Sequence, residues 1–391
     1  MPFQRFGLLC LFILISDSLF AQIRHTRVTW HENPSQEAII SWTSDEIDED
    51  AKVYYDLGPA SGKLQFERGV FAQGRYTRGV FRRGPVYNHV HLTGLTPSTD
   101  YYFEIQASYG TSQKLWFRTA PKEGDDFRLI LGGDSRSDPE QRIKMNLVMK
   151  SSIERDEGIL ALVHGGDYVM NGTSWSEWSE WLRHHEITTS ESGRLLPIIP
   201  TRGNHEYSQR IFNEVWAWPN DGLGYFSSEI GDLALLILNT EVSVHGEQKT
   251  WLKDQLKSLR PQKKWVVANY HRPAYPAVKR PANSKAAWVP LFEEFSIDLA
   301  VESDGHVYKQ TAPLYKDKID LERGIIYVGE GGLGVKQRTP ASDRWYLNHE
   351  SAFSTSAHHI QILSISENQM IFEGLDENLK GLSSFSLQPR N

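Results

Sequence analysis

The chain has 391 residues, a formal net charge of −7 and a sequence pI near 6.1, with no long basic tract. A nucleic-acid groove is therefore not expected, because binding a phosphate backbone needs a clustered positive face. Small phosphorylated or sulfated substrates remain compatible with this charge, and the composition gives no indication of oligomeric state. At roughly 100–200 residues per domain, the length predicts two domains.

Residues 1–21 are expected to be a secretory signal peptide. Arg5 gives a basic start, residues 6–15 form an apolar run, and cleavage is expected after Ala21. We therefore expect a secreted or periplasmic protein, with no later apolar run long enough to span a membrane. The only cysteine, Cys10, lies in this segment, so disulfide and thiolate chemistry are not expected in the mature chain.

Residues 22–121 are predicted to form a β-sandwich of about 100 residues. Short segments rich in Val, Ile, Tyr, Trp and Thr alternate apolar and polar positions and are separated by turn residues. The polar segment TAPKEGDD, at 119–126, is read as a linker. The predicted strands are RVTWHE, EAIISWTS, AKVYYDLG, YNHVHLTGL, YYFEIQASYG and QKLWFRTA.

Residues 122–391 are predicted to form an α/β domain, because strands now alternate with loops and helices. The strands are nearly continuous in apolar character, as expected of sheets covered on both faces. Trp175, Trp178 and Trp181 recur at three-residue spacing on one predicted helix, which favours a buried helical face over a carbohydrate-binding platform. The main segments are FRLILGG, QRIKMNLVMKSSIER, ILALVHGG, WSEWSEWLRHHE, LLPIIPTRG, QKTWLKDQLKSL, KKWVVANY, IDLAVESDG, IIYVGE, HHIQILSISE and QMIFEGLD.

Residue types that bind metals follow five of these predicted strands. Sites in open α/β sheets lie at the carboxyl ends of the strands, where neighbouring loops converge. Each residue alone is more often a turn residue or a hydrogen-bonded core residue, but the five together are hard to explain as turns. Carboxylate, amide and imidazole groups without sulfur suit Mn, Fe or Zn. The residues are Asp134, Asp167, Asn204 with its neighbour His205, His271 and His306.

The motifs that contain these residues resemble those of a known family. In order, GGDS (132–135), GGDYVMNG (165–172), GNHE (203–206), ANYH (268–271) and DGHVY (304–308) resemble the calcineurin-like metallophosphoesterases. The N-terminal segments, from VTWHE to LWFRTAP, look like the fibronectin-like domain of purple acid phosphatases. The resemblance covers nearly the whole chain after residue 21 and implies a fibronectin-like sandwich followed by a metallophosphoesterase domain.

The resemblance also implies roles for single residues. Asp167 would bridge two metal ions, and Asp134 would bind one of them. Asn204, His271 and His306 would complete the site of the other ion. His205 would stabilise the transition state or help to protonate the leaving group. In two-metal phosphoester chemistry the ions polarise the phosphoryl oxygens and activate a water for in-line attack.

Three positions depart from the family pattern. Met170 stands where purple acid phosphatases have tyrosine, Arg136 stands two residues after Asp134, and Tyr308 stands at the second position of His-x-His. One metal site is therefore complete and the other is altered. Tyr308 is expected to face the altered site, because residues two apart in an extended segment share a face with each other.

Several groups could fill the altered site, and the sequence leaves the choice open. Tyr308 could coordinate a hard ion through its phenolate, or it could pack as an ordinary half-buried ring. Arg136 could replace an ion with a fixed charge whose fork suits phosphate or sulfate oxygens. Glu302 or Asp304 could also bind. One or two divalent or trivalent ions (Fe, Mn or Zn) are therefore expected.

The sequence predicts an exported metal-dependent hydrolase of phosphate esters, either monoesters or diesters. A sulfate-ester hydrolase on the same scaffold is one alternative, and a catalytically decayed metal-binding or adhesion module is another. The motif GEGGLG, at 329–334, matches a dinucleotide fingerprint only in its letters, because no helix pattern follows it. It is read as a turn near the active site, and a dehydrogenase is rejected.

Overall fold

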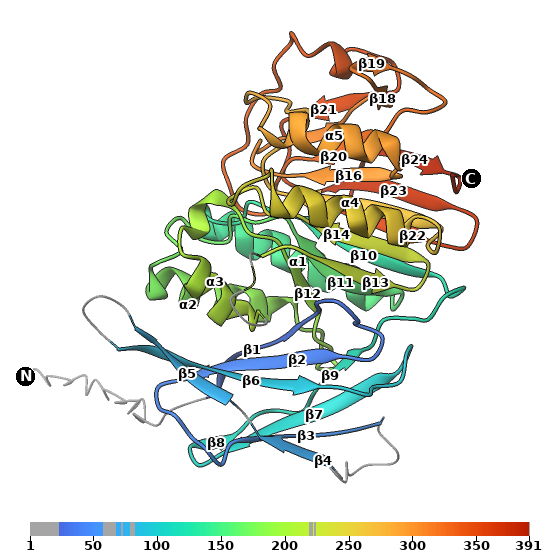
Figure 1. Ribbon diagram of the computed structural model, residues 1–391. Coiled ribbons are helices and arrows are strands. Elements are labelled where there is room, and N and C mark those ends of the chain that lie inside the picture. Colours follow the sequence, from blue (N-terminus) through green and yellow to red (C-terminus); the bar gives the residue numbers. More distant parts are fainter. Residues whose placement is uncertain are drawn as a thin grey trace, which may run out of the picture.

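The structure is a computed structural model in which two domains are stacked along the long dimension of the molecule (Figure 1). A strand-rich N-terminal domain is followed by an α/β domain, which confirms the predicted fold class. Within the described part of the chain, no helix is long and apolar enough to cross a membrane. The predicted signal peptide lies outside the described residues, and the domain boundaries at 21/22 and 121/122 stay predictions. The structure describes residues 23–57, 68–71, 73–78, 83–218, 222 and 224–390.

The N-terminal domain consists of two sheets that face each other across an apolar interior. Strand β7 shows the cause, because Tyr101, Phe103 and Ile105 alternate with partly exposed residues and point inward. The first sheet has the order β1-β2-β6-β5 and the second has the order β4-β3-β7-β8, with β9 also paired to β7. The strands are β1 (Arg24–Thr29), β2 (Ala38–Ser44), β3 (Lys52–Leu57), β4 (Arg68–Phe71), β5 (Gln73–Arg78), β6 (Arg83–Leu92), β7 (Asp100–Ala107), β8 (Gly110–Thr111) and β9 (Leu115–Arg118).

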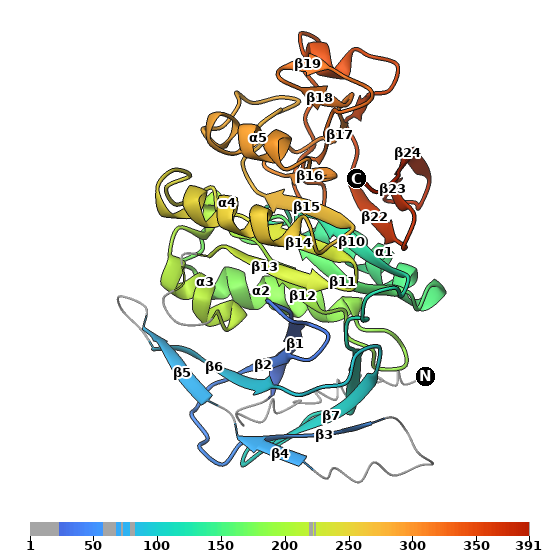
Figure 2. The same cartoon turned by 45° about the vertical axis from the view of Figure 1, so that its right-hand side comes forward.

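The α/β domain has four layers, with two sheets packed face to face between outer helices (Figure 2). Strands β10, β11 and β12 run parallel in one sheet, and β14, β15, β16 and β20 run parallel in the other. One outer face packs on α1 and the other on α4 and α5, since each strand has apolar residues on both sides.

Among the described residues, three of the five α-helices begin at a residue whose side chain caps the first turn. In α1 the Asp138 side chain accepts a hydrogen bond from the Gln141 N–H, and Pro139 occupies the first turn. In α2 the rings of Trp178 and Trp181 are buried and Trp175 packs against the core, which confirms the buried helical face. The helices are α1 (Pro139–Arg155), α2 (Trp175–His185), α3 (Gln209–Trp216), α4 (Glu247–Leu259) and α5 (Ser284–Glu294), with short 3-10 turns at Glu186–Thr188, Asn204–Glu206 and Trp345–Leu347.

Apart from β18 and β19, which form a separate two-stranded sheet, the strands of the α/β domain divide between the two sheets in chain order, and the last three return to the first sheet. Strands β22, β23 and β24 extend that sheet beyond β10 by antiparallel pairing. The strands are β10 (Phe127–Gly132), β11 (Ile159–His164), β12 (Ile198–Pro200), β13 (Phe226–Ile230), β14 (Leu233–Ile237), β15 (Trp265–Tyr270), β16 (Leu299–Glu302), β17 (Tyr308–Gln310), β18 (Leu314–Tyr315), β19 (Lys318–Ile319), β20 (Ile326–Gly329), β21 (Phe353–Thr355), β22 (His359–Ile365), β23 (Met370–Asp376) and β24 (Gly381–Leu387).

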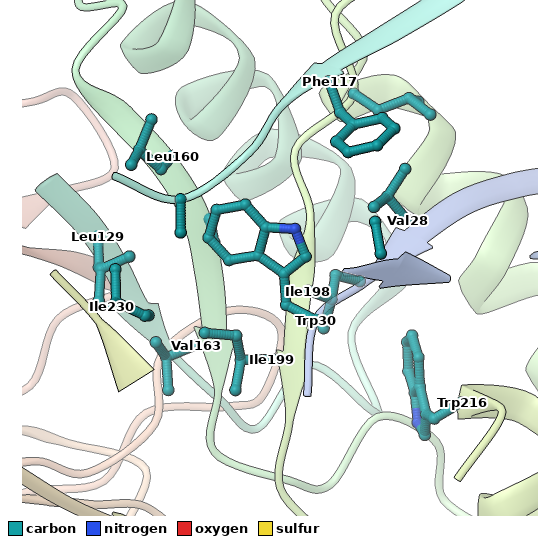
Figure 3. Close-up of a cluster of buried hydrophobic side chains, with 14 of the residues drawn as sticks. Val28, Trp30, Phe117, Leu129, Leu160, Val163, Ile198, Ile199, Trp216 and Ile230 are labelled. Atoms are coloured by element: carbon teal, nitrogen blue, oxygen red, sulfur yellow. The ribbon is translucent and has the colours of Figure 1, made fainter. Parts of the chain in front are cut away.

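The two domains share one continuous sheet, which the sequence did not predict. Strand β1 pairs in parallel with β12 through Thr29 and Ile198, and the Trp30 N–H donates to the Ile198 carbonyl at 2.9 Å. The Trp30 ring is fully buried among apolar side chains of both domains (Figure 3). We call this contact the domain seam: β1 with Trp30 on one side, and β12 with the core beneath it on the other.

Candidate metal centre

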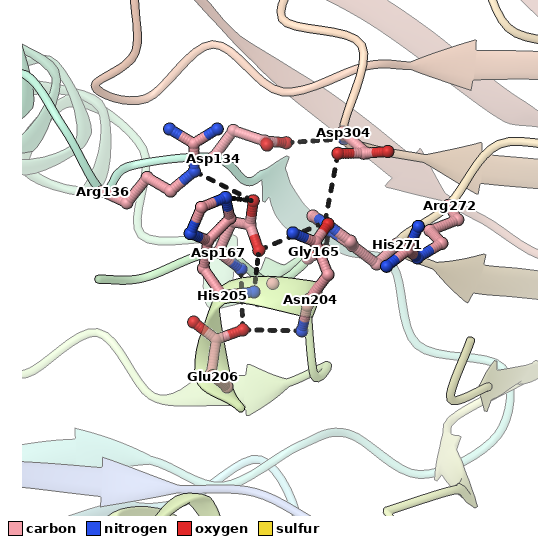
Figure 4. Close-up of polar contacts among 12 residues, drawn as sticks. Asp134, Arg136, Gly165, Asp167, Asn204, His205, Glu206, His271, Arg272 and Asp304 are labelled. Carbon is pink, nitrogen blue, oxygen red and sulfur yellow. Dashed lines mark hydrogen bonds and ion pairs between the residues drawn. The ribbon is translucent and has the colours of Figure 1, made fainter. Parts of the chain in front are cut away.

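The carboxyl ends of the parallel strands in both sheets meet at one place, and the predicted metal ligands meet there with them. Asp134 follows β10, Asp167 follows β11, His271 follows β15 and Asp304 follows β16. A ligand atom from each of these four buried residues lies within 4.8 Å of one from every other. Asp134, Asp167 and His271 of the expected set belong to this cluster, and Asn204 and His205 lie beside them (Figure 4). His306 lies beside Asp134. The cluster also includes Asp304, a residue that the sequence offered only as an alternative.

Three acceptor atoms surround the His271 Nε2 atom. The distances from it are 3.2 Å to Asp167 Oδ1, 3.2 Å to Asn204 Oδ1 and 3.7 Å to Asp304 Oδ1. The His271 Nδ1 atom lies 2.8 Å from the Gly165 carbonyl, which can only accept, so this nitrogen carries the proton. In neutral His271 the Nε2 lone pair therefore points at other lone pairs, an arrangement that a proton or a metal ion between them would stabilise.

The electrostatics of His271 and Asp167 agree with this arrangement. Burial lowers the pKa of His271, but the carboxylates of Asp167, Asp134 and Asp304 outweigh burial and bring this pKa well above its usual value. Burial raises the pKa of Asp167, but His271 and the His205 backbone N–H outweigh it and bring this pKa below its usual value. The cluster therefore holds Asp167 ionised and attracts positive charge.

The backbone at the cluster adopts an uncommon conformation at four of these positions. Asp134, Asp167, Asp304 and His306 have φ values of 54°, 59°, 67° and 60°. Left-handed φ values are rare outside glycine, and they concentrate at functional sites because the surrounding structure must hold them. Gly166 has a φ of 94°, and a Cβ there would lie 2.6 Å from the Gly203 nitrogen. The loops that carry Asp167 and Asn204 thus approach closely only because of glycine.

Glu206 is a supporting residue that sequence reasoning did not single out. Its buried carboxylate accepts hydrogen bonds from the backbone N–H groups of Asp167 (3.0 Å), Tyr168 (2.9 Å) and Gly203 (2.6 Å). Burial and the nearby Asp167 charge raise the pKa of Glu206 to about 8, against the three N–H donors. Glu206 thus connects the loop after β11 with the loop after β12. Its position in the motif GNHE was the feature of the sequence that could have identified it.

Arg136 lies on the other side of Asp167. Its Nε donates to Asp167 Oδ2 at 3.0 Å, and its Nη2 lies 3.2 Å from His306 Nε2. Its Nη1 contacts the Met170 sulfur at 3.4 Å, so two of the three departures from the family pattern touch each other. The His306 Nε2 atom also lies 3.2 Å from Asp134 Oδ1, a buried oxygen without a hydrogen-bond partner.

His205 stands at the mouth of the cluster. Its backbone N–H donates to Asp167 Oδ1 at 3.0 Å, and its Nδ1 atom lies 2.8 Å from the Met170 carbonyl. The carbonyl can only accept, so Nδ1 carries a proton, and Nε2 faces the cluster 4.0 Å from Asp167 Oδ2. The side chain remains 17% exposed, which leaves Nε2 accessible to a substrate.

Tyr308 does not face the cluster, contrary to the expectation. Its hydroxyl lies 2.5 Å from Ser383 Oγ, and its ring packs against Phe353 and His359. The left-handed φ of His306 breaks the extended path, and β17 begins only at Tyr308, so the two side chains do not share a face. Burial raises the pKa of Tyr308 to about 12, which keeps the phenol protonated at neutral pH.

Glu302 is not a ligand in this arrangement either. Its carboxylate contacts the buried Lys309 ammonium and accepts hydrogen bonds from the Tyr270 hydroxyl (2.6 Å) and the Ala274 N–H (2.6 Å). Lys309 also donates to Glu330 at 2.8 Å, and the Glu330 carbonyl accepts from the His306 N–H at 2.7 Å. This buried network holds the Asp304–His306 loop in place.

The GEGGLG segment lies beside the centre, as its reading as a turn predicted. Gly331 has a φ of 81°, and a Cβ there would collide with the Asp134 carboxylate. Among the described residues no helix begins directly after the segment, so it has no helix N-terminus that could bind a dinucleotide.

A cavity of about 580 Å³ opens beside Asp304. Three basic side chains, those of Arg272, Lys279 and Arg280, line it together with His245. Arg272 pairs with Glu241, and Lys279 contacts Asp304. Another cavity of about 490 Å³ is lined by Ile23, Tyr109 and Glu186 among others, and it shares no residue with the metal cluster.

The donor set fits one or more metal ions, because carboxylate, amide and imidazole groups without sulfur converge at one place. Ligands at the carboxyl ends of strands from two packed sheets, with a histidine at the mouth, define a metal-dependent hydrolase of ester bonds.

Comparison with known proteins agrees with this class. The sequence matches the family described as purple acid phosphatase, N-terminal domain, over residues 23–119. It also matches the family described as calcineurin-like phosphoesterase, over residues 133–308. A purple acid phosphatase of Arabidopsis thaliana, number 15, is 25% identical over 334 residues, which are 74% of this chain and 59% of that protein.

Other similar proteins extend further along the chain. An uncharacterized Mycobacterium tuberculosis protein is 24% identical over 372 residues, covering 79% of this chain and 69% of that protein. The structure of purple acid phosphatase PPD1 from yellow lupin seeds superposes with a TM-score of 0.79 at 17% identity, covering 94% of this chain and 74% of that one. The chain is therefore a purple acid phosphatase-like member of the calcineurin-like phosphoesterases, and it is a metallophosphoesterase.

Proposed function

We propose that the protein is an exported hydrolase of small phosphate esters, and that the reaction takes place at the cluster around Asp167 and His271. The observation that carries the proposal is the position of this cluster. Converging acceptors lie beside a histidine and an arginine and open toward a cavity with basic walls. A cavity of about 580 Å³ matches the size of sites for small molecules.

Different groups at the site would have different roles in hydrolysis of the ester. Asp167, His271 and Asp304, with Asn204, would hold a metal ion, which would polarise a phosphoryl oxygen and lower the pKa of a water molecule. Arg136 presents a planar, permanently charged fork that binds a second phosphoryl oxygen. His205 directs Nε2 toward the leaving group, and in its imidazolium form the Nε2–H would donate a hydrogen bond or its proton to the leaving oxygen.

The basic cavity supports a substrate that carries negative charge beyond the reacting phosphate. Arg280 is exposed and has no ion pair among the described residues, whereas Arg272 and Lys279 are paired with carboxylates. A phosphorylated or sulfated leaving group would therefore meet at least one free positive charge there.

Export rests on the N-terminal sequence alone. Expression with the native N-terminus should yield secreted or periplasmic protein that begins at Gln22, as N-terminal sequencing can establish. Deletion of residues 2–21 should keep the protein inside the cell. Retention of the native chain in the cytoplasm would contradict the proposal.

A screen of phosphomonoesters, phosphodiesters and sulfate esters tests the reaction. The fork of Arg136 suits any tetrahedral oxyanion, so sulfate esters belong in the same panel. Chelated protein should be inactive, and reloading with Mn, Zn or Fe should restore hydrolysis of phosphate esters. Activity on sulfate esters alone would change the substrate class. Inactivity on every ester, with metal bound, would favour a metal-binding module.

A further inference from the structure

We propose that the centre holds one metal ion, that the Arg136 guanidinium occupies the position of a second ion, and that Asp304 replaces His306 as a ligand. The inference concerns the same site as the proposed function and rests on that function only for its location. It differs from the two-ion arrangement that the family resemblance implies.

One side of the centre offers a complete set of acceptors for a single ion. Asp167 Oδ1 and Asn204 Oδ1 each lie 3.2 Å from His271 Nε2, and Asp304 Oδ1 lies 3.7 Å from it. Two carboxylates, an amide oxygen and an imidazole nitrogen thus come from four different loops. Asp134 joins the same cluster and contributes a buried oxygen, Oδ1, that lacks a hydrogen-bond partner.

The other side is already occupied by a cation. Arg136 directs Nε at Asp167 Oδ2 (3.0 Å) and Nη2 at His306 Nε2 (3.2 Å), and its side chain is only 10% exposed. A second ion would need these same two lone pairs. Because guanidinium does not lose its proton in proteins, the two cations exclude each other at this position.

No substitute ligand approaches this side from the other altered positions. The Met170 sulfur, a weak acceptor, is covered by Arg136 at 3.4 Å. The Tyr308 hydroxyl is directed to Ser383. The three departures from the family pattern therefore act together, because two of them remove ligands and the third supplies the missing positive charge.

Asp304 is better placed than His306 to complete the single-ion site. The His306 Nε2 lone pair accepts from Arg136, whereas Asp304 Oδ1 faces His271. Asp304 also contacts the Lys279 ammonium, whose side chain is 36% exposed and can turn to solvent when an ion binds. One divalent ion and Arg136 together balance the three carboxylates of Asp134, Asp167 and Asp304.

Metal titration of the full-length chain tests this arrangement without using activity. Chelated protein is titrated with Mn²⁺, bound metal is counted by elemental analysis, and electron paramagnetic resonance distinguishes an isolated ion from a spin-coupled pair. The wild type should bind one isolated ion per chain. Arg136→Ala should gain a second, weaker ion, whereas Arg136→Lys and the control Arg338→Ala should stay at one.

Two further variants test the choice of ligand. Asp304→Asn should weaken the single ion by about 100-fold or more, because even outer-shell partners of metal ligands cost about 10–100-fold. His306→Ala should leave the affinity within about threefold. Among the described residues, the side chain of Arg338, the control, donates only to the backbone carbonyls of Asp304 and Gly305, not to a ligand side chain.

Several results would overturn the inference. One is the finding of two spin-coupled ions in the wild type. Another is that folded Arg136→Ala still binds only one ion. A third is that His306→Ala loses the ion whereas Asp304→Asn keeps it. Failure of the proposed function is a separate result. A one-ion protein that hydrolyses no ester would retain this site assignment, and a two-ion protein that hydrolyses phosphate esters would retain the function alone.

Discussion

The metal centre and the domain seam both join segments that are far apart in the chain, but they do so with opposite chemistry. At the centre, Asp167, His271 and Asp304 place polar atoms at strand ends, and Asp167 and Asp304 do so with a left-handed backbone conformation. At the seam, Trp30 and Ile198 bury apolar surface, and one parallel pairing continues the sheet.

This difference indicates where each region is sensitive. Loss of a polar group at the centre should change metal binding and rate while the fold persists, because the core beneath is intact. Loss of an apolar group at the seam should change stability while the ligands keep their geometry. The predictions below test this division, from the largest expected effect to the smallest.

Asp167→Asn should abolish both metal binding and hydrolysis. Asp167 contacts His271 and Arg136 through different oxygens, so the amide removes charge from both sides of the centre. Elemental analysis and an ester assay would measure the loss. His91 is exposed in the N-terminal domain, so His91→Ala serves as a control that should keep both metal binding and hydrolysis. A metal-loaded Asp167→Asn protein would contradict the assignment.

His205→Ala should reduce kcat by about 10²–10⁴-fold while metal content stays at the wild-type level. The His205 side chain directs Nε2 at the substrate side, and only its backbone N–H contacts Asp167. Steady-state kinetics with metal analysis would measure both effects. Loss of metal with unchanged activity per bound ion would show that His205 had been assigned wrongly.

Trp30→Ala should lower the free energy of unfolding by about 3–5 kcal/mol, as expected when a buried aromatic ring is deleted from a core. The ring is fully buried at the seam, whereas Trp345 is 43% exposed, so Trp345→Ala is the matched control. Urea unfolding would measure both. If Trp30→Ala changed metal affinity without changing stability, the division between seam and centre would fail.

Acid should destabilise the protein through buried histidines near the seam. Burial lowers the pKa values of His25, His31 and His185 to about 3, from about 6.5 in the unfolded chain. Below pH 6.5 the unfolded state binds these protons first, so stability present at higher pH is lost as pH falls toward 3. Each histidine should cost roughly 2 kcal/mol between pH 6.5 and pH 5.

Replacing one of these histidines tests its share of the acid effect. His31 contacts the rings of Trp218 and Phe226 and has an unpartnered Nε2, so phenylalanine should fit its site. His31→Phe should reduce the pH dependence of the unfolding free energy by about one proton. An unchanged dependence would show that His31 is protonated in the folded protein.

Tyr308→Phe should have the smallest effect, about 1 kcal/mol of stability or less, through loss of one hydrogen bond to Ser383. Metal content and rate should not change, and the metal-loaded wild type should lack the colour of an iron–phenolate bond. Bleaching of a coloured protein by this substitution would return Tyr308 to the metal centre.

The sequence alone determined the order of the elements and most of the centre. Apolar runs followed by Asp134, Asp167, Asn204 and His271 left a clear pattern, because ligands must follow strands whose ends converge. The helix tryptophans were also readable, since their three-residue spacing matches a helical face.

Only the tertiary structure decided which side chains complete the centre and how the domains join. Tyr308 was misplaced because a left-handed residue, His306, interrupts the two-residue alternation that the prediction assumed. Asp304 and Arg136 take part through contacts between loops from different strands, which no local pattern records. The seam has the same cause: the pairing of Thr29 with Ile198 joins residues far apart in the chain, and apolar burial fixes it without a motif.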